Sequence, residues 1–292
     1  MSVRPPDPER RLPRPIARVA VRALIASSGV ALGACGDGEW EATAARRFEE
    51  LRRFDAPAAR QGVAVGASHF YAIGNRVITK HDARSGRQVD EWKGSEGGPV
   101  IHLNSGVVLD GKLYCAHSNY PAVPMASSIE IFDAGTLEHR GSRSLGIAAG
   151  SATWIDRRDD RWWVAFAHYA GRGGEPGKGP EWTTLVAFDE GWRRIAAYTY
   201  PPELVARFAG RSNSGGTWGG DGLLYLTGHD APEVYVLRLP RSGSVLELVE
   251  ILPAPIAGQG IAWDRSEPGV LYGIVRRDGR VIVSRLVSSG AG

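Results

Sequence analysis

Short runs of alternating apolar and polar residues, each about four to eight residues long, recur from residue 60 to residue 287. Such alternation turns one face of a strand toward a core and the other toward solvent, and it predicts β-strands. Glycine and polar turn residues separate the runs. Long helical patterns are absent from this stretch, and only residues 44–54 (AARRFEELRRF) show helical character.

The runs group into five similar units. Each unit opens with a polar and a small residue, continues with a short apolar strand and a polar turn, and then has a strand rich in aromatic residues. A third strand follows in most units, and a fourth in several. The units cover residues 61–93, 104–145, 150–200, 213–252 and 259–286. Repetition of a four-stranded unit predicts an all-β chain folded as a five-bladed β-propeller.

The fifth unit lacks a strand, and the N-terminal part of the chain can supply it. Residues 50–62 (ELRRFDAPAARQG) match residues 247–260 (ELVEILPAPIAGQG) in length, proline and ending. The second stretch is the outer strand of the fourth unit running into the fifth. We therefore expect residues 48–57 to form the outer strand of the fifth blade and to close the ring, which protects its sheet edges.

The N-terminus has the features of an export signal. A basic stretch precedes an apolar run, residues 23–34, that is too short to span a bilayer. The run ends in Leu-Gly-Ala-Cys, which resembles the bacterial lipobox, so Cys35 is the expected lipidation site and first mature residue. An ordinary secretory signal, or a cytosolic chain with a basic tail, are the alternatives. We expect a signal peptide at 1–34, a linker at 35–47, the propeller at 48–287 and a tail at 288–292.

Charge and cysteine content limit the classes of function that the chain can have. The 292 residues carry a net charge of +3, but residues 1–34 contribute +4, with six arginines against Asp7 and Glu9; the remainder is therefore near −1. A body without surplus positive charge is not suited to nucleic acid. Of the two cysteines, Cys115 lies in an apolar run and is expected to be a buried thiol. Contact with a membrane is expected only through the lipid anchor.

Equivalent positions of the units bring polar residues to one end of the ring axis. The entry to the first strand and the loop after the second strand open on the same face of a propeller. Alignment places at the entry Gln61, Asn104, Ser151, Asn213 and Gln259, and after the second strand Asn75, His117, His168, His229 and Arg276.

Three of these residues are histidines from consecutive blades, His117, His168 and His229. Converging imidazoles are ligands for Mn, Zn or Fe, so the sequence predicts a divalent transition-metal site. A metal-free polar pocket that binds a sugar or an acid is the alternative. Expected ligand-binding residues are Gln61, Asn104, Asn119, Asn213, Gln259 and Arg276. The candidates for proton transfer near the pocket are Tyr120, Tyr169 and Arg276.

Two hydrolase classes lack support. The chain has no Gly-x-Ser-x-Gly motif for a serine nucleophile. A glycosidase needs paired carboxylates at the axis, and the expected axial positions hold amides, hydroxyls and imidazoles.

The five units, with Gln-Gly before an apolar strand and FYAIGNRVITKHDARSGRQVDEW behind it, resemble glutamine cyclotransferase-like propellers over the whole mature chain. The Phe-Thr-Gln-Gly phrase of that family is echoed only by Phe54 and Gln61-Gly62, and its catalytic acid has no match, so its activity is not implied. The histidine set with Gln259 resembles the manganese site of oligogalacturonate lyases. That resemblance implies a metal that binds a uronate carboxylate and acidifies the neighbouring carbon–hydrogen bond.

Two classes of function follow. One is an exported enzyme, a metal-dependent lyase or hydrolase that acts on a small polar or sugar-acid substrate. The other is an exported propeller that binds a small-molecule ligand or serves as a scaffold without catalysis. The fold alone does not choose between them, because propellers serve both purposes.

Overall fold

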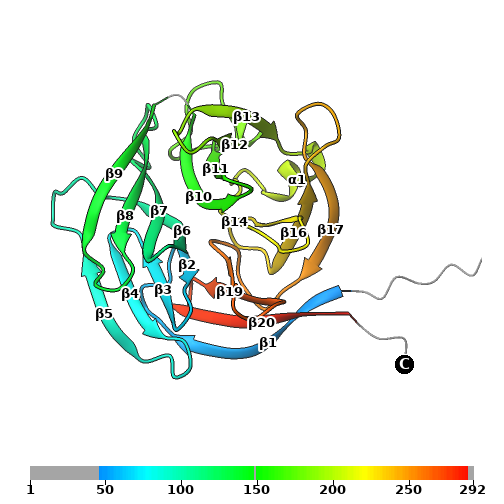
Figure 1. The fold of residues 1–292 in the computed structure, drawn as a ribbon. Helices are drawn as coiled ribbons and strands as arrows, with labels where there is room; N and C mark the ends of the chain where they lie inside the picture. Colours follow the sequence, from blue (N-terminus) through cyan, green and yellow to red (C-terminus); the bar gives the residue numbers. More distant parts are fainter. Residues whose placement is uncertain (1–45, 148, 289–292) are drawn as a thin grey trace, which may run out of the picture. The chain divides into compact units, whose positions relative to one another are not determined.

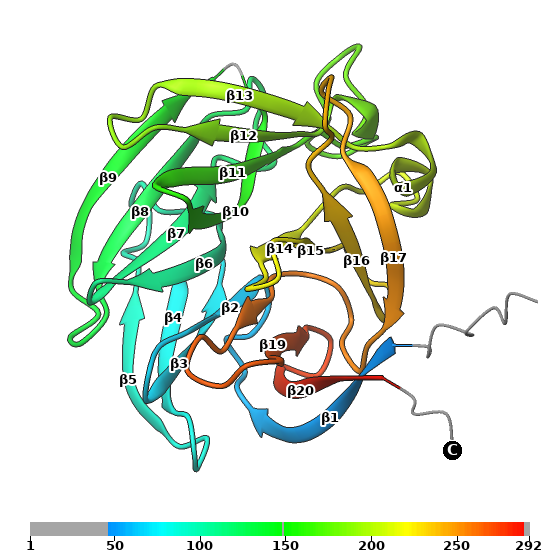
Figure 2. The same cartoon turned by 45° about the vertical axis from the view of Figure 1, so that its right-hand side comes forward.

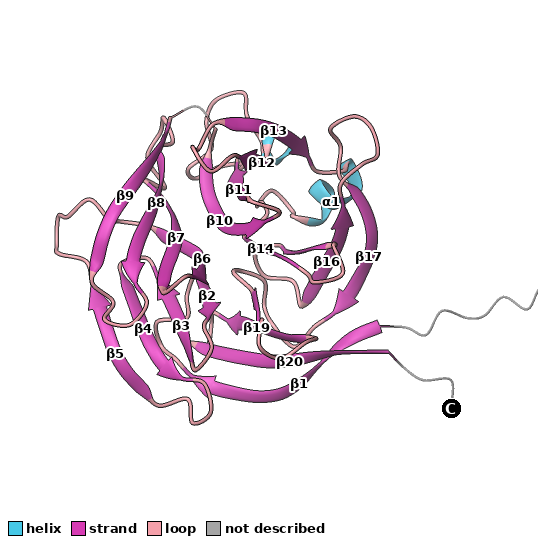
Figure 3. Cartoon of the chain, in the orientation of Figure 1, coloured by secondary structure: helices cyan, strands magenta, loops and turns pink. Residues whose placement is uncertain are grey.

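The computed structural model describes residues 46–147 and 149–288. Within them the chain forms twenty strands, grouped in five four-stranded antiparallel sheets. Figure 1 shows the sheets arranged around a centre, and Figure 3 shows how little helix accompanies them. The expected signal peptide, Cys35 and residues 289–292 lie outside the described residues. In the described part of the chain, no helix has the length and apolar character needed to cross a membrane.

Each of the first four blades is a run of four consecutive strands. Blade 1 contains β2 (Gly62–Val65), β3 (His69–Gly74), β4 (Val77–Asp82) and β5 (Gln88–Lys93). Blade 2 contains β6 (Leu103–Leu109), β7 (Lys112–Ser118), β8 (Ser127–Asp133) and β9 (His139–Gly146). Blade 3 contains β10 (Ser151–Arg158), β11 (Arg161–Ala167), β12 (Thr184–Phe188) and β13 (Arg194–Thr199). Blade 4 contains β14 (Gly215–Trp218), β15 (Leu224–Thr227), β16 (Glu233–Arg238) and β17 (Glu247–Pro253).

Blade 5 joins the two ends of the ring. Its strands are β18 (Ala262–Trp263), β19 (Val270–Val275), β20 (Arg280–Ser288) and β1 (Arg46–Asp55). The outermost strand β1 pairs antiparallel with β20, from Arg46 opposite Ser288 to Asp55 opposite Arg280. The predicted five-bladed propeller closed by an N-terminal strand is confirmed. The helical character of residues 44–54 was misleading, because pairing with β20 overrides local propensity over Arg46–Asp55.

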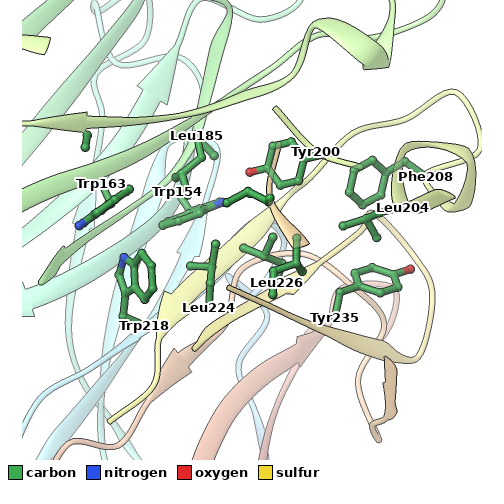
Figure 4. Packing of buried hydrophobic residues seen from close by; sticks show 14 residues of the cluster. Trp154, Trp163, Leu185, Tyr200, Leu204, Phe208, Trp218, Leu224, Leu226 and Tyr235 are labelled. Atoms are coloured by element: carbon green, nitrogen blue, oxygen red, sulfur yellow. The ribbon is translucent and has the colours of Figure 1, made fainter. Parts of the chain in front are cut away.

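The core is divided among the blade interfaces. The described residues form five buried apolar clusters, and each cluster joins two neighbouring blades. Figure 4 shows the cluster between blades 3 and 4, where Trp154 packs beside Leu224 and Leu226. The short helix α1 (Pro202–Arg207) adds Leu204 to this cluster, and Figure 2 shows it on the outside of the ring near β16 and β17. A second short turn of 3-10 helix, η1, spans Pro180–Trp182.

Packing at the centre explains why the chain contains two Gln-Gly phrases. The innermost strands contact one another in sequence, and β18 contacts β2 to complete the ring. The two phrases meet there, because the backbone N–H of Gly260 donates to the carbonyl of Gln61 at 3.0 Å. A Cβ on Gly260 would lie 2.7 Å from the Cα of Gly62 and 2.5 Å from Ser105 Oγ. Only glycine permits so close an approach of the two backbones.

Cys115 is a free and fully buried thiol on β7, as predicted. Burial raises its pKa well above the usual range for a thiol.

Candidate functional site

A cavity of about 360 Å³ opens at one end of the axis, which we call the axial cavity. Residues of all five blades line it, so it occupies the centre of the ring. Its amide side chains are Gln61, Asn75, Asn104 and Gln259. Its hydroxyl groups come from Tyr120, Thr153, Tyr169 and Ser214, and its ionisable bases are His102, His229, Arg172, Arg211 and Arg276.

The charged residues of the axial cavity are all basic. Arg172 lies in the long loop after β11, Arg211 precedes β14, and Arg276 lies in the turn between β19 and β20. The described lining contains no aspartate or glutamate. The ion pairs found among the described residues do not involve these three arginines. Guanidinium groups without carboxylate partners favour an anionic ligand, especially a planar carboxylate or a phosphate.

At one corner of the cavity, His229 and Arg276 of the lining form a hydrogen-bonded chain with Asp230, which lies behind His229 and outside the lining. Nδ1 of His229 lies 2.5 Å from Oδ2 of Asp230, and Nε2 lies 2.9 Å from Nη1 of Arg276. An arginine can only donate, so Nε2 accepts and Nδ1 carries the hydrogen that is donated to Asp230. Burial lowers the pKa of His229, and the charges of Arg276 and Arg211 lower it further, whereas Asp230 opposes the shift.

The backbone beneath His229 is held by two successive residues in the left-handed region. Gly258 has φ +61° and Gln259 has φ +64°, an uncommon conformation for a residue with a long side chain. A Cβ on Gly258 would lie 2.4 Å from the carbonyl carbon of His229. The side-chain amide of Gln259 donates to the carbonyl of His229 at 2.8 Å. Strained backbone of this kind is typical of functional sites, and here it fixes the position of His229.

Amide side chains from blades 1 and 2 and a hydroxyl from blade 3 line the cavity as well. Nε2 of Gln61 donates to Oδ1 of Asn75 at 2.7 Å, and the amide of Asn104 donates to the carbonyl of Ala152 at 2.8 Å. The hydroxyl of Thr153 is buried and has no partner within the described residues. These amides and the free hydroxyl can exchange hydrogen bonds with hydroxyl groups of a ligand.

Aromatic rings line another part of the cavity. The ring of Tyr120 lies 4.9 Å from that of His102 and 5.3 Å from that of Tyr169, measured between centroids. Burial raises the pKa of Tyr169 to about 12, so its phenol is protonated at neutral pH. Burial lowers the pKa of His102 to about 4, with smaller contributions from His117 and Arg276, so His102 is neutral. Both side chains are therefore available as neutral hydrogen-bonding groups.

The predicted three-histidine cluster is not formed. Among the described residues, no three His, Cys, Asp or Glu side chains are placed where they could hold a metal ion together. His117 accepts from the backbone N–H of Ile101 at 3.1 Å and shares a hydrogen bond with Ser128 at 2.8 Å. Nε2 of His168 lies 3.2 Å from the carbonyl oxygen of Ala149, and of these three histidines only His229 lines the axial cavity.

The reason is a difference in phase. His117 is inside β7 and pairs with Leu103, whereas His168 follows the last residue of β11 and His229 stands two residues beyond β15. Successive side chains of a strand point to opposite faces, so a shift of one residue reverses the direction of a ring. Histidines at similar positions of the sequence repeat therefore have side chains in different surroundings.

The ligand-binding candidates divide in the same way. Gln61, Asn104, Gln259 and Arg276 line the axial cavity, as do the proton-transfer candidates Tyr120 and Tyr169. Asn119 and Asn213 do not. Asn119 caps its own loop, accepting from the N–H of Ala126 at 2.8 Å. Asn213 is fully buried and uses its amide to hold the carbonyls of Gly215 and Thr227.

Sequence reasoning missed His102, Arg172 and Arg211. None of them has an equivalent in the other units, so the alignment of repeats did not select them. The available signal was their position in connections that enter or leave the end of the ring where the Gln-Gly phrases lie. Positively charged residues in such loops are candidates for ligand binding, because loops carry many binding residues.

Comparisons with known proteins found distant structural likenesses and no family. No family model matches the chain, and no curated protein matches it. Hydrazine synthase of Kuenenia stuttgartiensis is 11% identical, with 77% of this chain and 82% of that chain covered and a TM-score of 0.47. A luciferin-regenerating enzyme is 10% identical, with 85% and 96% covered and a TM-score of 0.48. A chain of the mitotic checkpoint complex is 10% identical, with 90% and 98% covered and a TM-score of 0.43. Values this low carry no argument about the activity of this chain.

Proposed function

We propose that this propeller binds a small, hydroxylated carboxylate, such as a sugar acid, in the axial cavity. The observation that supports it is the presence of three arginines in a lining without a carboxylate. Arg211 and Arg276 would hold the anionic end of the ligand through charge-assisted hydrogen bonds. The amides of Gln61, Asn75 and Asn104 would bind its hydroxyl groups. The arginines and the amides of one cavity would then bind the charged part and the hydroxylated part of the same ligand.

The anion site takes the place of a metal in this proposal. In the three-histidine hypothesis, a metal ion was to bind the ligand carboxylate. The geometry of the described residues favours arginine for that task, because His117 and His168 are committed to structural hydrogen bonds. A ligand-binding propeller and an enzyme acting on the same acid both fit this arrangement.

Calorimetric titration of the purified protein tests the proposal. D-glucuronate should bind, and D-glucose, its uncharged counterpart, should bind at least about tenfold more weakly because it lacks the charged group that pairs with arginine. Arg211→Gln and Arg276→Gln should each lower the affinity for D-glucuronate about 10- to 100-fold, the value of a hydrogen bond to a charged group. Arg193→Gln, a surface arginine paired with Asp189 away from the cavity, is the matched control. Equal binding of both sugars, or no effect of either variant, would contradict the proposal.

We also propose that the protein acts outside the cytoplasm as a bacterial lipoprotein. The support is the basic stretch, apolar run and Leu-Gly-Ala-Cys ending of residues 1–35. Mass spectrometry of protein from the membrane fraction should find a lipidated Cys35 as the first residue. Intact Met1 on protein from the soluble cytosol would reject this.

A further inference from the structure

The hydrogen bonds of His229 fix its protonation state in the ligand-free protein. Nδ1 donates to Asp230, and Nε2 accepts from Nη1 of Arg276 at 2.9 Å. If His229 were protonated, its Nε2–H would face an N–H of Arg276 at that distance, and neither group could accept. Geometry therefore keeps the imidazole neutral as long as Arg276 occupies this position.

The charged groups that face His229 come from three parts of the ring. Asp230 lies beside it in the turn after β15, Arg276 comes from the β19–β20 turn, and Arg211 from the segment before β14. Two cations and burial oppose a positive charge on the ring. The carboxylate of Asp230 favours that charge, but its side chain is 68% exposed and its field is screened by water.

An anion would change this balance. A carboxylate bound to Arg276 competes for the N–H that now points at His229, and it brings a negative charge to the same corner. Nε2 would then have no donor against it. The backbone of His229 would stay in place, because Gln259 holds its carbonyl.

We propose that His229 is a ligand-binding residue that contacts the bound carboxylate as an imidazolium, so that each ligand enters together with one proton. This inference rests on the anion site proposed above. A hydronium ion of the solvent gives up the proton, breaking one of its O–H bonds and leaving water, and a new N–H bond forms at Nε2. This N–H donates to one carboxylate oxygen while Arg276 donates to the other. Nδ1 keeps its hydrogen bond to Asp230. No other bond is made or broken, and the complex gains one positive charge relative to simple anion binding.

The consequence is a defined pH dependence. Affinity rises as the pH falls through the interval between the pKa of His229 in the free protein and its higher pKa in the complex. Linkage of one proton gives at most about a tenfold change in affinity per pH unit. Outside that interval the affinity is constant.

The test is an NMR pH titration of the ring resonances of His229 in the purified protein, assigned by their absence in His229→Gln. With saturating D-glucuronate the pKa of His229 should rise by at least about one unit, which corresponds to a tenfold linkage; with D-glucose it should not move. Arg276→Gln should raise the pKa of His229 in the ligand-free protein, because the opposing charge is gone and the amide, unlike a guanidinium, can turn an acceptor oxygen toward Nε2. It should also reduce the further rise with D-glucuronate. His139→Gln, on the outer strand of blade 2, is the matched control and should leave the His229 titration unchanged.

The outcomes separate the two proposals. Binding of D-glucuronate without a rise in the pKa of His229 overturns proton uptake and leaves the anion site standing. A rise with inorganic phosphate but none with D-glucuronate overturns the assignment to carboxylates. Failure of D-glucuronate, glycerate and phosphate to perturb any resonance of the cavity overturns the anion site and this inference together.

Discussion

Arginines stand at both ends of the propeller axis, and their surroundings differ. At the end opposite the axial cavity, Arg265 forms an ion pair with Asp156, whose side chain is 1% exposed. The same carboxylate accepts from the hydroxyl of Thr217 at 3.0 Å and from the N–H of Trp218 at 2.9 Å. At the axial cavity, Arg172, Arg211 and Arg276 have no carboxylate in the described lining.

The difference separates a structural end from a binding end. A buried carboxylate is tolerated only when its oxygens are paired and hydrogen-bonded. Asp156, on β10, meets this condition through two residues of β14 and through Arg265, which follows β18. Arg276 instead shares a hydrogen bond with a neutral imidazole, which leaves its positive charge uncompensated. The same residue type thus closes the ring at one end and offers a charge to a ligand at the other. The three predictions below test this comparison, from the largest expected effect to the smallest.

Removal of β1 should affect both ends, because the strand completes the blade on which Arg265 and Arg276 depend. Deleting residues 46–57 removes the pairing with β20 and the buried ring of Phe48, which is 5% exposed. Loss of a buried phenylalanine alone costs about 3–5 kcal/mol, so the free energy of unfolding should fall by at least about 4 kcal/mol. Thermal unfolding measures it. A deletion mutant that melts at the wild-type temperature would show that the ring does not need this closure.

Asp156→Asn should be the most damaging single change at the closed end. It removes the negative charge opposite Arg265. Thr217 and Trp218 both donate to Oδ2, so an amide oxygen that keeps these two bonds turns its NH2 group toward the guanidinium of Arg265. Breaking a buried ion pair costs about 3–5 kcal/mol. Because Arg265 is partly exposed, we expect the free energy of unfolding to fall by about 3 kcal/mol, the lower end of this range.

Asp230→Asn is its matched control at the cavity, because that side chain is 68% exposed. Denaturant unfolding should give a loss within about 0.5 kcal/mol for this surface change. Equal losses of unfolding free energy in Asp156→Asn and Asp230→Asn would contradict the view that only the end at Asp156 is structural.

Acid should lower the free energy of unfolding, because it protonates His102, which is neutral in the folded protein. The pKa of His102 is about 4 in the folded protein and near about 6.5 when unfolded, so the unfolded chain binds more protons between these values. Stability contributed by neutral His102 is therefore present above about pH 6.5 and is lost as the pH falls toward 4. Partial exposure of the ring reduces the expected loss to about 1–2 kcal/mol.

His102→Asn should flatten the dependence of unfolding free energy on pH over this range, and His139→Asn on the outer strand β9 is the control. A steeper dependence in His102→Asn than in the wild type would contradict a lowered pKa of His102 in the folded protein.

The sequence by itself determined the architecture. Alternating patterns with a period of two define strands, and five copies of one unit define five blades, because each blade must cover the apolar faces of its neighbours. The two Gln-Gly phrases located the closure, and the structure joins them through Gly260 and Gln61. Placement of Gln61, Gln259 and Arg276 at the axis followed from their positions at blade entries and turns.

The tertiary structure alone decided which side chains share the cavity. His117, His168 and His229 occupy similar places in the repeat. A difference of one or two residues in their position relative to the strand end leaves the first two bonded to segments of their own blades and only the third in the cavity. Arg172 and Arg211 have no equivalent residue in the corresponding connections of other blades, so only the path of their own loops brings them to the cavity. A repeat fixes backbone positions through pairing and packing, whereas the direction of one side chain depends on local register, which the repeat does not determine.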